Sequence, residues 1–528
     1  MIHHSPLLDV EIPDLPLTEY VLAGGAGQRD KPALIDGASG WVMTYGELED
    51  AIRSLAGGLA AAGFGRGDVL ALMAPNGPEY AVVFHGAAMV GGAVTTINPA
   101  YTQAEVHHQL ADSGARILVT IAPLADAAAR ACTGTAVTEV YLLDGADEAD
   151  EADEAERTLP VRPLTALAGS PLAAHVPVGP DDVVALPYSS GTTGLSKGVM
   201  LTHKNLVANV AQTLGAIPAA PDERLMAVLP FFHIYGMQCM MNCGLRAGAT
   251  VVTLPRFDLE QFLRAHQDYR ITRSFVAPPI VLALARHPLV DSFDLSHLRL
   301  VNSGAAPLKA ELAVECGKRL GCDVIQGYGM TELSPVSHLT PAGWFRPGSV
   351  GITAPSTQTR IVDPLTGADR DTGEEGEVWV RGPQVMKGYL NNPQATAATV
   401  DVDGWLHTGD LGYVDADGHV YVVDRLKELV KYKGFQVPPA ELEAVLLRHP
   451  DVADAAVIGL PDDEAGEIPA GYVVLRPGAA TSPEEITRFV AGEVAHYKQI
   501  RRLEVIDAIP KSAAGKILRR VLRDSART

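Results

Sequence analysis

Short apolar runs of β-type character alternate with helical periodicities through the middle of this 528-residue sequence, from Val183 to Ile325. Leu225 to Leu229 and Ala249 to Leu254 are strand-like, as is Val69 to Leu72 earlier in the chain. Helical spacing is expected at Leu259 to His266, Pro279 to Arg286 and Ala310 to Leu320, and Thr202 is the expected N-cap of a helix whose Leu206, Val210 and Leu214 recur every four residues. Strands that alternate with helices form parallel sheets with helices on both faces. The sequence therefore predicts an α/β fold in which a large N-terminal domain is built on doubly wound parallel sheets.

A different pattern occupies the C-terminal part of the chain. A helix is expected at Pro439 to Arg448 and a strand at Tyr472 to Leu475, and Ser482 has the spacing of a helix N-cap. A chain of this length is too long for one ordinary core. We therefore predict two domains, an N-terminal domain at 1–424 and a small α+β domain at 425–528.

The acidic balance of the chain limits its partners. The formal net charge is −21, which argues against nucleic acid or an anionic membrane as the main partner. Part of that charge lies in the run Asp147 to Glu156, which we interpret as a solvated surface loop. No segment has the ~18 uncharged apolar residues that a membrane span needs. Nothing near Met1 resembles a signal peptide, and the five scattered cysteines are typical of reduced thiols, so we expect a cytoplasmic protein.

Four polar segments follow predicted strands. They are YSSGTTGLSKGV (Tyr188 to Val199), PFFHIYG (Pro230 to Gly236), NSGAAP (Asn302 to Pro307) and QGYGMTE (Gln326 to Glu332). In open parallel sheets, ligands bind outside the C-terminal ends of the strands. We therefore expect the four loops to converge on one crevice.

The first of these segments is a candidate phosphate-binding loop. Its hydroxyls and glycines can wrap around a polyphosphate while Lys197 adds a positive charge. It is not a Walker A loop, because Ser196 precedes the lysine and Gly198 follows it. A plain turn is the alternative, and a strand before the segment and a helix after it favour the phosphate loop. The candidate residues are Ser189, Ser190, Gly191, Thr192, Thr193, Gly194 and Lys197.

The fourth segment and a later acid–base pair complete a nucleotide site. Tyr328 offers a flat face for a purine, Thr331 a hydroxyl for a phosphate and Glu332 a hard oxygen for Mg²⁺. HTGD (His407 to Asp410) supplies Asp410, and VDRLKE (Val423 to Glu428) supplies Arg425. Such an acid–base pair can bind ribose hydroxyls, and a surface salt bridge is the alternative. These residues predict an ATP site.

The remaining candidates are weaker when taken one at a time. His233 lies among aromatic residues and is a candidate gate of an acyl pocket, or else a core histidine. The small residues of NSGAAP can admit a flat ring beside Tyr328, or serve close backbone packing. KYKGFQ (Lys431 to Gln436) and PKSAAGK (Pro510 to Lys516) expose lysines on Gly-bounded loops, which solubility alone would also explain.

In their order along the chain, these segments resemble those of the adenylate-forming superfamily, which contains acyl-CoA synthetases, nonribosomal-peptide adenylation domains and beetle luciferase. The resemblance runs from about Tyr45 to Arg520, and the runs PFFHIYG, VAPPIVLALA and GYGMTELSPV are most similar to 4-coumarate:CoA ligases. It implies an ATP-dependent acid:CoA ligase that forms an acyl-adenylate and then a CoA thioester. ATP, Mg²⁺ and coenzyme A are the implied cofactors and co-substrates, and an aryl acid of the 4-coumarate or cinnamate type is the implied substrate.

The resemblance also implies a mobile C-terminal domain that docks in two orientations about a hinge at Lys427. In the first orientation, Lys516 would bridge the substrate carboxylate and the α-phosphate of ATP. In the second, the face that carries Lys431 would close over the crevice for the thiol step. The implied catalytic residues are Lys516, Lys431, Gln436 and His233, and the implied CoA-binding residues are Arg256, Lys433 and Gly434. The implied nucleotide-binding set adds Ala305, Gln326, Gly327, Tyr328, Thr331, Asp410, Arg425 and Lys427 to the phosphate loop.

An acid pocket is carried over position by position. Its implied lining residues are Tyr235, Gln238, Cys239, Phe275, Gly304, Gly327, Gly329, Pro335 and Val336. The chain departs from the plant enzymes at Gln238, Asn302 and Ser337, where those enzymes commonly have Asn, Lys and Leu. A medium- or long-chain fatty acyl-CoA synthetase and a stand-alone adenylation enzyme that loads a carrier protein therefore stay open. The expected partners are the small molecules alone, with no nucleic acid and no membrane, for a monomer or weak dimer.

Overall fold

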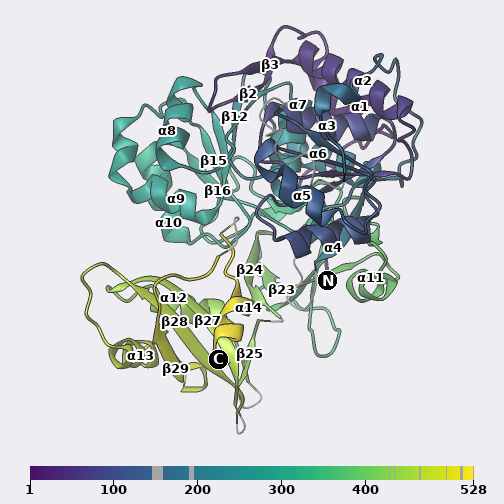
Figure 1. Cartoon of the computed structure of the whole chain (residues 1–528). Helices are drawn as coiled ribbons and strands as arrows, with labels where there is room; N and C mark the ends of the chain where they lie inside the picture. The colour runs from purple at the N-terminus through teal and green to yellow at the C-terminus, as the bar shows by residue number, and fades with distance from the viewer. Residues whose placement is uncertain are drawn as a thin grey trace. The chain divides into compact units, whose positions relative to one another are not determined.

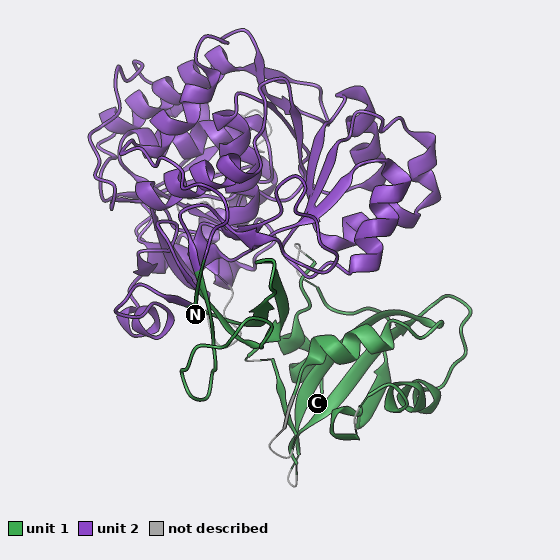
Figure 2. Ribbon diagram, turned by 180° about the vertical axis from the view of Figure 1, so that it is seen from behind, with its two compact units in different colours: residues 1–3, 359–379, 407–528 green, residues 4–358, 380–406 purple. Residues whose placement is uncertain are grey.

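The computed structural model describes residues 1–144, 159–189, 196–426, 428–432, 435–462, 465–494, 496–511 and 515–526. It contains two compact units (Figure 2). Unit 1 comprises residues 1–3, 359–379 and 407–528, and unit 2 comprises residues 4–358 and 380–406. Residues 407–424 thus pack with the C-terminal part of the chain, whereas the sequence predicted a domain boundary at 424. The predicted boundary at 424 separates the part of the chain that is expected to move from the rest, and it stays a prediction.

The first sheet of unit 2 has the strand order β16-β15-β14-β12-β13-β2-β3. Its strands are β16 (Asp323–Gln326), β15 (Leu300–Ser303), β14 (Arg273–Val276), β12 (Arg224–Ala227), β13 (Thr250–Thr253), β2 (Pro32–Asp36) and β3 (Val42–Thr44). Neighbouring strands are parallel except for β3, which is antiparallel to β2. The chain runs from β12 toward β13 on one side and from β14 toward β16 on the other. This reversal is the topological switch point at which open α/β sheets bind ligands.

Three helices cover one face of this sheet, namely α8 (Leu259–Asp268), α9 (Pro278–Arg286) and α10 (Ala310–Leu320) (Figure 1). Helix α10 buries Ala313 and Cys316, and Gly321 ends it in the left-handed conformation with φ 66°. Glycine is favoured there because it has no Cβ to clash with the last turn. The helices predicted between Leu259 and Leu320 are therefore confirmed.

The second sheet of unit 2 has the order β10-β11-β9-β5-β4-β6-β7-β8, with β22 also paired to β11. Its strands are β10 (Tyr188–Ser189), β11 (Lys197–Thr202), β9 (Val183–Ala185), β5 (Ala93–Thr96), β4 (Val69–Leu72), β6 (Ile117–Thr120), β7 (Glu139–Leu142), β8 (Val161–Pro163) and β22 (Gly388–Tyr389). Strands β4 to β9 are parallel, whereas β11 is antiparallel to β9, β10 and β22. The sequence was therefore right about parallel sheets and did not predict this antiparallel edge.

The candidate phosphate loop lies in that antiparallel edge. The sequence predicted a helix capped by Thr202 after this segment but did not predict the strand before that helix. Strand β11 comes first, and Ser189 of β10 pairs with Lys197 of β11. The run Lys197 to Thr202 reads KGVMLT and has no regular alternation. It forms a strand because it pairs with β9, β10 and β22, which local periodicity cannot reveal.

Helix α6 (His203–Ala216) begins only after β11. Thr202 is its N-cap, as predicted, and forms a capping box with Asn205. Such a box satisfies two backbone N–H groups that have no partner within the helix. Every residue from Asn205 to Thr213 is buried and Leu214 is half-buried, so the helix is enclosed on all sides and not only along the predicted stripe of Leu206, Val210 and Leu214.

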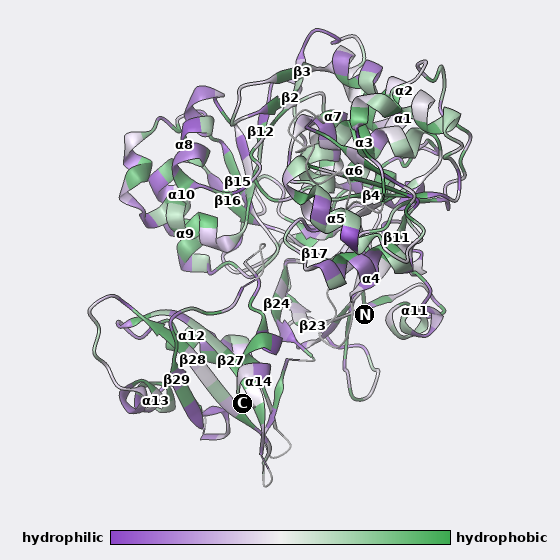
Figure 3. Cartoon of the chain, viewed as in Figure 1, coloured by the Kyte–Doolittle hydropathy of each residue, from purple (hydrophilic) through white to green (hydrophobic). Residues whose placement is uncertain are grey.

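Helix α3 (Pro78–Met89) packs between the two sheets of unit 2 and contacts β2, β4 and β5. Every residue of this helix except Glu79 is buried. A helix that is apolar on all sides is stable only when it is surrounded by protein. Colouring by hydropathy shows that the strands around β4 are also hydrophobic, which is typical of parallel sheets covered on both faces (Figure 3).

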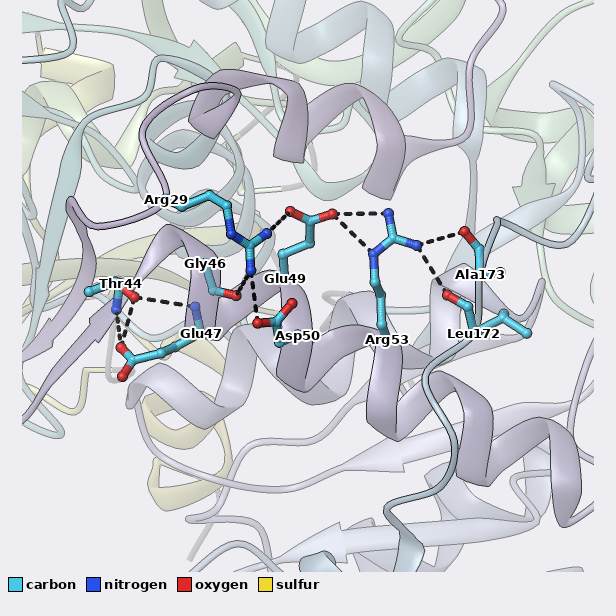
Figure 4. A network of polar contacts seen from close by, with 9 residues as sticks. All are labelled: Arg29, Thr44, Gly46, Glu47, Glu49, Asp50, Arg53, Leu172 and Ala173. Atoms are coloured by element: carbon cyan, nitrogen blue, oxygen red, sulfur yellow. Dashed lines mark hydrogen bonds and ion pairs between the residues drawn. The ribbon is translucent and has the colours of Figure 1, made fainter.

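Polar contacts set the start and the outer face of α2 (Tyr45–Ala61), as Figure 4 shows. Thr44 caps the helix and forms a capping box with Glu47, an arrangement that contributes about 1 kcal/mol. On the outer face, the Arg29 guanidinium lies 2.9 Å from the Glu49 carboxylate. Exposed pairs of this kind contribute little to the free energy of unfolding, so burial of the opposite face stabilises the helix.

The other helices of unit 2 are shorter or lie at its periphery. They are α1 (Leu17–Leu22), α4 (Gln103–Ser113), α5 (Ala125–Ala131), α7 (Cys243–Arg246), α11 (Pro393–Thr399) and the π-helix η5 (Gly236–Asn242). A small antiparallel sheet is formed by β17 (Tyr328–Gly329), β18 (Val336–Leu339) and β19 (Ile352–Thr353).

Unit 1 contains two sheets. The first has the order β1-β20-β21-β23-β24, with β1 (Ile2–His4), β20 (Gln358–Val362), β21 (Gly376–Arg381), β23 (Leu406–Val414) and β24 (Val420–Arg425). The second has the order β26-β25-β28-β27, with β25 (Val430–Tyr432), β26 (Phe435–Val437), β27 (Val452–Asp462) and β28 (Gly466–Leu475), and β29 (Arg502–Val505) is parallel to β28.

Helices α12 (Pro439–Leu446), α13 (Pro483–Ala491) and α14 (Arg519–Ser525) complete unit 1. Ser482 caps α13 with a capping box, as its spacing predicted. The predicted α+β character of the C-terminal part is confirmed. Among the residues that the structure describes, no helix is both long enough and apolar enough to cross a membrane.

Candidate functional site

The loops that follow the strands of the first sheet meet at its switch point. The Tyr235 hydroxyl, from the segment after β12, donates a hydrogen bond of 3.2 Å to the backbone carbonyl of Asn302 in β15. The Gly327 N–H, just after β16, donates to the Ser303 carbonyl at 3.3 Å. Three of the four predicted segments therefore lie against one another.

Tyr235 packs against Phe275 and Gly304 at this point, and we call these three residues the aromatic slot. The rings of Tyr235 and Phe275 meet edge to face, with centroids 6.4 Å apart and planes at 82°. A Cβ on Gly304 would lie 2.9 Å from the Tyr235 ring, so this position has room only for hydrogen. Burial, together with nearby Cys239, raises the pKa of Tyr235, so its hydroxyl stays protonated and donates.

Gly304 also provides a test of the slot. Gly304→Leu should lower kcat/KM for cinnamate roughly 10- to 200-fold, because the added side chain pushes Tyr235 into the space for the ring. The measurement is pyrophosphate release over a range of acid concentrations. Thermal unfolding and the KM for ATP serve as controls for folding. Cinnamate turnover with an unaltered KM would refute the slot as the acid pocket.

The other glycine of the predicted pocket has a different role in the structure. A Cβ on Gly329 would collide with the backbone carbonyl of Pro335, where β17 approaches β18. The missing side chain of Gly329 therefore serves close backbone packing. Val336, the first residue of β18, is held by Asn209 of α6, whose side chain bonds both its N–H and its carbonyl.

Gln238 and Cys239 lie on the π-helix η5, a feature that is frequent near functional sites. The Gln238 amide donates to the Leu206 carbonyl at 2.7 Å and accepts from the Asn242 amide at 2.7 Å. Burial raises the pKa of the Cys239 thiol well above its usual range, so this cysteine is neutral. Both side chains are thus set by contacts within the core.

The predicted gate His233 lies in the loop between β12 and η5 and is half-buried. Its Nδ1 accepts a hydrogen bond of 3.2 Å from the Tyr235 N–H. A neutral imidazole in this position therefore carries its proton on Nε2. The histidine and the slot tyrosine are fixed to each other through this contact.

The predicted purine-binding segment continues from β16. The Gln326 side chain accepts from the Leu308 N–H at 3.0 Å and so fixes the loop that contains Ala305, which has φ 68° and is exposed. The Tyr328 ring lies 5.7 Å from the His338 ring. Thr331 begins the short helical turn that carries Glu332. These residues follow β16 directly and are fixed by contacts with neighbouring segments.

Glu332 is the centre of a compact cluster and is only 5% exposed. Its Oε1 accepts hydrogen bonds from the Ser189 hydroxyl at 3.0 Å and from the Tyr389 hydroxyl at 2.8 Å. The Lys197 ammonium lies 4.0 Å from the centre of the Tyr389 ring. This brings the fourth predicted segment into contact with the phosphate loop, so all four segments are joined by contacts.

The comparisons with known proteins agree with this geometry. Residues 23–390 match the AMP-binding enzyme family, and residues 441–516 match the AMP-binding enzyme C-terminal domain. This chain is an AMP-binding enzyme. The predicted membership of the adenylate-forming superfamily is thereby confirmed.

The relatives of this AMP-binding enzyme are similar along its whole length. 4-Coumarate–CoA ligase 3 from Oryza sativa subsp. japonica is 45% identical, with 99% of this chain and 94% of the relative covered. 4-Coumarate–CoA ligase 1 from Petroselinum crispum is 44% identical, with 99% and 96% covered. The predicted class, an AMP-forming acid–CoA ligase that uses ATP and CoA, is confirmed.

Solved structures extend the similarity to the fold. ATP-bound MatB from Rhodopseudomonas palustris has a TM-score of 0.89 at 31% identity, with 98% of this chain and 99% of that chain covered. The anthranilate CoA ligase AuaEII in complex with anthranoyl-AMP has a TM-score of 0.88 at 25% identity, with 97% and 98% covered. The predicted fold, a large α/β domain followed by a C-terminal domain, is confirmed.

In unit 1 of the AMP-binding enzyme, the predicted ribose-binding residues form a pair. Asp410 of β23 and Arg425 of β24 lie opposite each other, with Nε and Oδ1 3.0 Å apart, and Asp410 is buried. Burial and the Arg425 charge lower the pKa of Lys516, while Glu428 and Asp410 oppose that shift. Lys516 is half-buried. The structure therefore gathers Lys516, Asp410 and Arg425 in one charged neighbourhood.

The candidate residues for the thiol step lie on surfaces. Lys431 is exposed on β25, and its backbone N–H donates to the Glu467 carboxylate at 2.8 Å. Arg256 is exposed in the loop after β13 of unit 2. Several candidates lie outside the described residues, namely Ser190, Gly191, Thr192, Thr193, Gly194, Lys427, Lys433 and Gly434, as does the side chain of Gln436 and the acidic run Asp147 to Glu156.

Tyr389 is the site residue that sequence reasoning missed. It lies on β22, 5% exposed, and contacts both Glu332 and Lys197. Burial and the Glu332 carboxylate raise its pKa, so the hydroxyl remains a donor. The only local signal is a Gly–Tyr pair before the turn at Asn391, which by itself predicts no more than a strand end.

Proposed function

We propose that this enzyme activates a planar aryl acid of the 4-coumarate or cinnamate type and transfers the acyl group to CoA. The aromatic slot of Tyr235, Phe275 and Gly304 carries this proposal, because two aromatic rings and a glycine without a side chain offer apolar surface to a flat ring. The names of the plant relatives, and the anthranoyl-AMP complex of a structural relative, support an aryl acid.

In the first step, a carboxylate oxygen of the acid attacks the α-phosphorus of ATP and the bond to pyrophosphate breaks. Negative charge develops on the α-phosphate oxygens, and Lys516 would stabilise it. The phosphate loop with Lys197 would hold the β- and γ-phosphates. Asp410 would accept hydrogen bonds from the ribose, with Arg425 holding its carboxylate in place.

The residues present fit a bound Mg²⁺. Mg²⁺ is usually held through one or two carboxylates together with substrate phosphates, and the buried Glu332 carboxylate is oriented by two hydroxyls. Among the described residues, no group of three or more His, Cys, Asp or Glu side chains could hold a metal by itself. Glu332 would therefore hold Mg²⁺ against the phosphates of ATP, where the ion neutralises charge on the departing pyrophosphate.

In the second step, the CoA sulfur attacks the acyl carbonyl carbon and AMP leaves. A free thiol has a pKa of about 8.5, so part of it is thiolate without a dedicated base, and its proton passes to solvent. The face that carries Lys431, Lys433, Gly434 and Gln436 would close over the crevice, with Arg256 on the CoA nucleotide. The C-terminal domain, residues 425–528, would turn about Lys427 between the two steps.

Two alternatives concern the same chemistry with other substrates. A medium- or long-chain fatty acid would need depth beyond the aromatic pair, and Gly304 lies directly against Tyr235. A carrier protein in place of CoA would leave the exposed basic residues Arg256 and Lys431 without a nucleotide to bind. We propose a cytoplasmic monomer or weak dimer whose partners are the acid, ATP and CoA.

Purified enzyme with ATP, Mg²⁺, CoA and 4-coumarate or cinnamate should yield AMP, pyrophosphate and the acyl-CoA. A panel of aryl and fatty acids, scored for pyrophosphate release with and without CoA, tests the substrate class. ADP as the nucleotide product would exclude the mechanism, because attack would then fall on the terminal phosphate. Faster turnover of fatty acids than of any aryl acid would exclude the aryl assignment.

A further inference from the structure

We propose that Tyr389 is a positioning residue that couples the metal-binding carboxylate to both ends of the phosphate loop. Its hydroxyl orients Glu332, and its ring holds the Lys197 ammonium. This inference rests on the proposed roles of Glu332 and Lys197 in binding Mg²⁺–ATP. It adds Tyr389 as a residue that holds both of these side chains in place.

The contacts join four elements of unit 2, namely β22, β10, β11 and the helical turn that carries Glu332. Tyr389 of β22 donates to Glu332 Oε1 at 2.8 Å, and Ser189 of β10 donates to the same oxygen at 3.0 Å. Lys197, the first residue of β11, lies with its ammonium 4.0 Å from the centre of the Tyr389 ring. Ser189 and Lys197 are paired in the hairpin that bounds the phosphate loop. One tyrosine therefore contacts the carboxylate and the lysine at once.

The backbone reinforces this placement. Strand β22 pairs with β11, with Tyr389 opposite Val199, and the Leu390 N–H donates to the Gly198 carbonyl at 2.8 Å. The Met386 N–H donates to the Glu332 carbonyl at 2.9 Å. The short segment around β22 thus bridges the phosphate loop and the turn that carries the carboxylate.

A buried tyrosine that serves only packing would not need its hydroxyl. Tyr80 of α3 is an example in the same unit, because its hydroxyl is buried and has no hydrogen-bond partner in the described part of the chain. The Tyr389 hydroxyl instead donates a hydrogen bond to the Glu332 carboxylate. A hydrogen bond to a charged group orients it as well as stabilising it, so loss of this hydroxyl should act on metal binding.

The two functions of Tyr389 can be separated by two substitutions. Tyr389→Phe removes the bond to Glu332 and keeps the ring below Lys197. Tyr389→Leu removes both. Tyr80→Phe is the matched control, because it deletes a buried hydroxyl that no carboxylate accepts.

The measurement is Mn²⁺ binding to the enzyme–ATP complex by electron paramagnetic resonance, with Mn²⁺ in place of Mg²⁺ and without acid or CoA. Tyr389→Phe should weaken Mn²⁺ binding about tenfold, as expected for loss of a hydrogen bond to a charged group. The affinity for metal-free ATP should stay near that of the wild type. Tyr389→Leu should also weaken metal-free ATP binding, by about 3- to 10-fold. Tyr80→Phe should change neither quantity.

A double-substitution cycle tests whether Tyr389 acts through Glu332. In a Glu332→Gln background, Tyr389→Phe should produce no further loss of Mn²⁺ affinity, because the orienting bond has lost its carboxylate. Ser189→Ala, which removes the other donor to the same oxygen, provides a second variant if Tyr389→Phe folds poorly. Unchanged Mn²⁺ affinity in both Tyr389→Phe and Ser189→Ala, or additive losses in the cycle, would overturn the proposal. Because neither acid nor CoA is present, a wrong substrate class would not affect these outcomes.

Discussion

Lys516→Ala should slow formation of the acyl-adenylate about 10²- to 10³-fold, which corresponds to ~3–4 kcal/mol of transition-state stabilisation. The loss is large because one preorganised cation faces charge that develops on the α-phosphate. The same variant should still convert a supplied acyl-adenylate and CoA to the thioester, since Lys516 is withdrawn from the crevice in the second proposed orientation. The two half-reactions are measured separately, by pyrophosphate release and by thioester formation.

Substitutions on the face of the C-terminal domain that carries Lys431 provide the matched comparison with Lys516→Ala. Lys431→Ala and Gln436→Ala should retain adenylate formation and slow the thiol step, because their face would close only in the second orientation. Equal loss of both steps in Lys516→Ala would indicate one static site and argue against a moving domain.

The state of Lys516 adds a pH dependence to the first step. Burial and the Arg425 charge lower its pKa below the usual lysine value, and its proposed role at the α-phosphate requires the charged form. Adenylate formation should therefore decline with rising pH earlier than an ordinary lysine would require. Thioester formation from supplied adenylate should not follow the same decline.

Arg519→Met should destabilise the C-terminal part of unit 1 by about 3–5 kcal/mol, because it leaves buried carboxylates without their cation. The Arg519 guanidinium donates to the Glu428 carboxylate, to Glu443 Oε1 at 2.7 Å and to the Val457 carbonyl at 3.1 Å. Its side chain is 11% exposed, and those of Glu428 and Glu443 are 7% and 12% exposed. The network joins α14 to α12 and β27.

The neighbouring Arg520 is the control for this prediction. It is 68% exposed and pairs with Asp524 at 3.7 Å, so Arg520→Met should change the free energy of unfolding by about 0.5 kcal/mol or less. The measurements are thermal unfolding and hydrogen–deuterium exchange of the amides in α12 and β27. Equal exchange rates in the two variants would contradict the structural role of Arg519.

The destabilisation should also depend on pH. Burial already raises the pKa of Glu443, while Arg519 opposes this shift. Without Arg519, the folded-state pKa of Glu443 rises further above its unfolded value, so the folded state gains stability from protonation as the pH falls. The loss of unfolding free energy caused by Arg519→Met should therefore be smaller near pH 5 than near pH 8. Because Arg519 lies three residues after Lys516, the variant should slow adenylate formation as well.

Much of the fold follows from local patterns. The strand at Val69 to Leu72, the helix capped by Thr202 and the helix capped by Ser482 lie where the sequence predicted them. Apolar spacing and capping residues act over a few residues, so they can be read without knowing the partners. The chemistry of the four polar segments was also visible in the sequence, because hydroxyls, glycines and lysines at strand ends suit phosphates.

The pairing of strands that lie far apart in the sequence could not be predicted in this way. The sequence predicted the helix capped by Thr202 but not the strand before it, where β11 pairs with β9, β10 and β22. The partner β22 is Gly388–Tyr389, nearly two hundred positions away in the chain. No local pattern specifies such a partner, because strand pairing is stabilised by long-range hydrogen bonds and burial.

The sequence by itself thus determined the parallel sheets, the order of the polar segments and the residue types of an ATP site. Only the tertiary structure decided that Tyr389 lies against Glu332 and Lys197, that Gly304 abuts Tyr235 while Gly329 abuts Pro335, and that residues 407–424 pack with the C-terminal part. The physical reason is the range of the forces: helix caps and periodicity arise between near neighbours, whereas these contacts form only when distant segments are packed together.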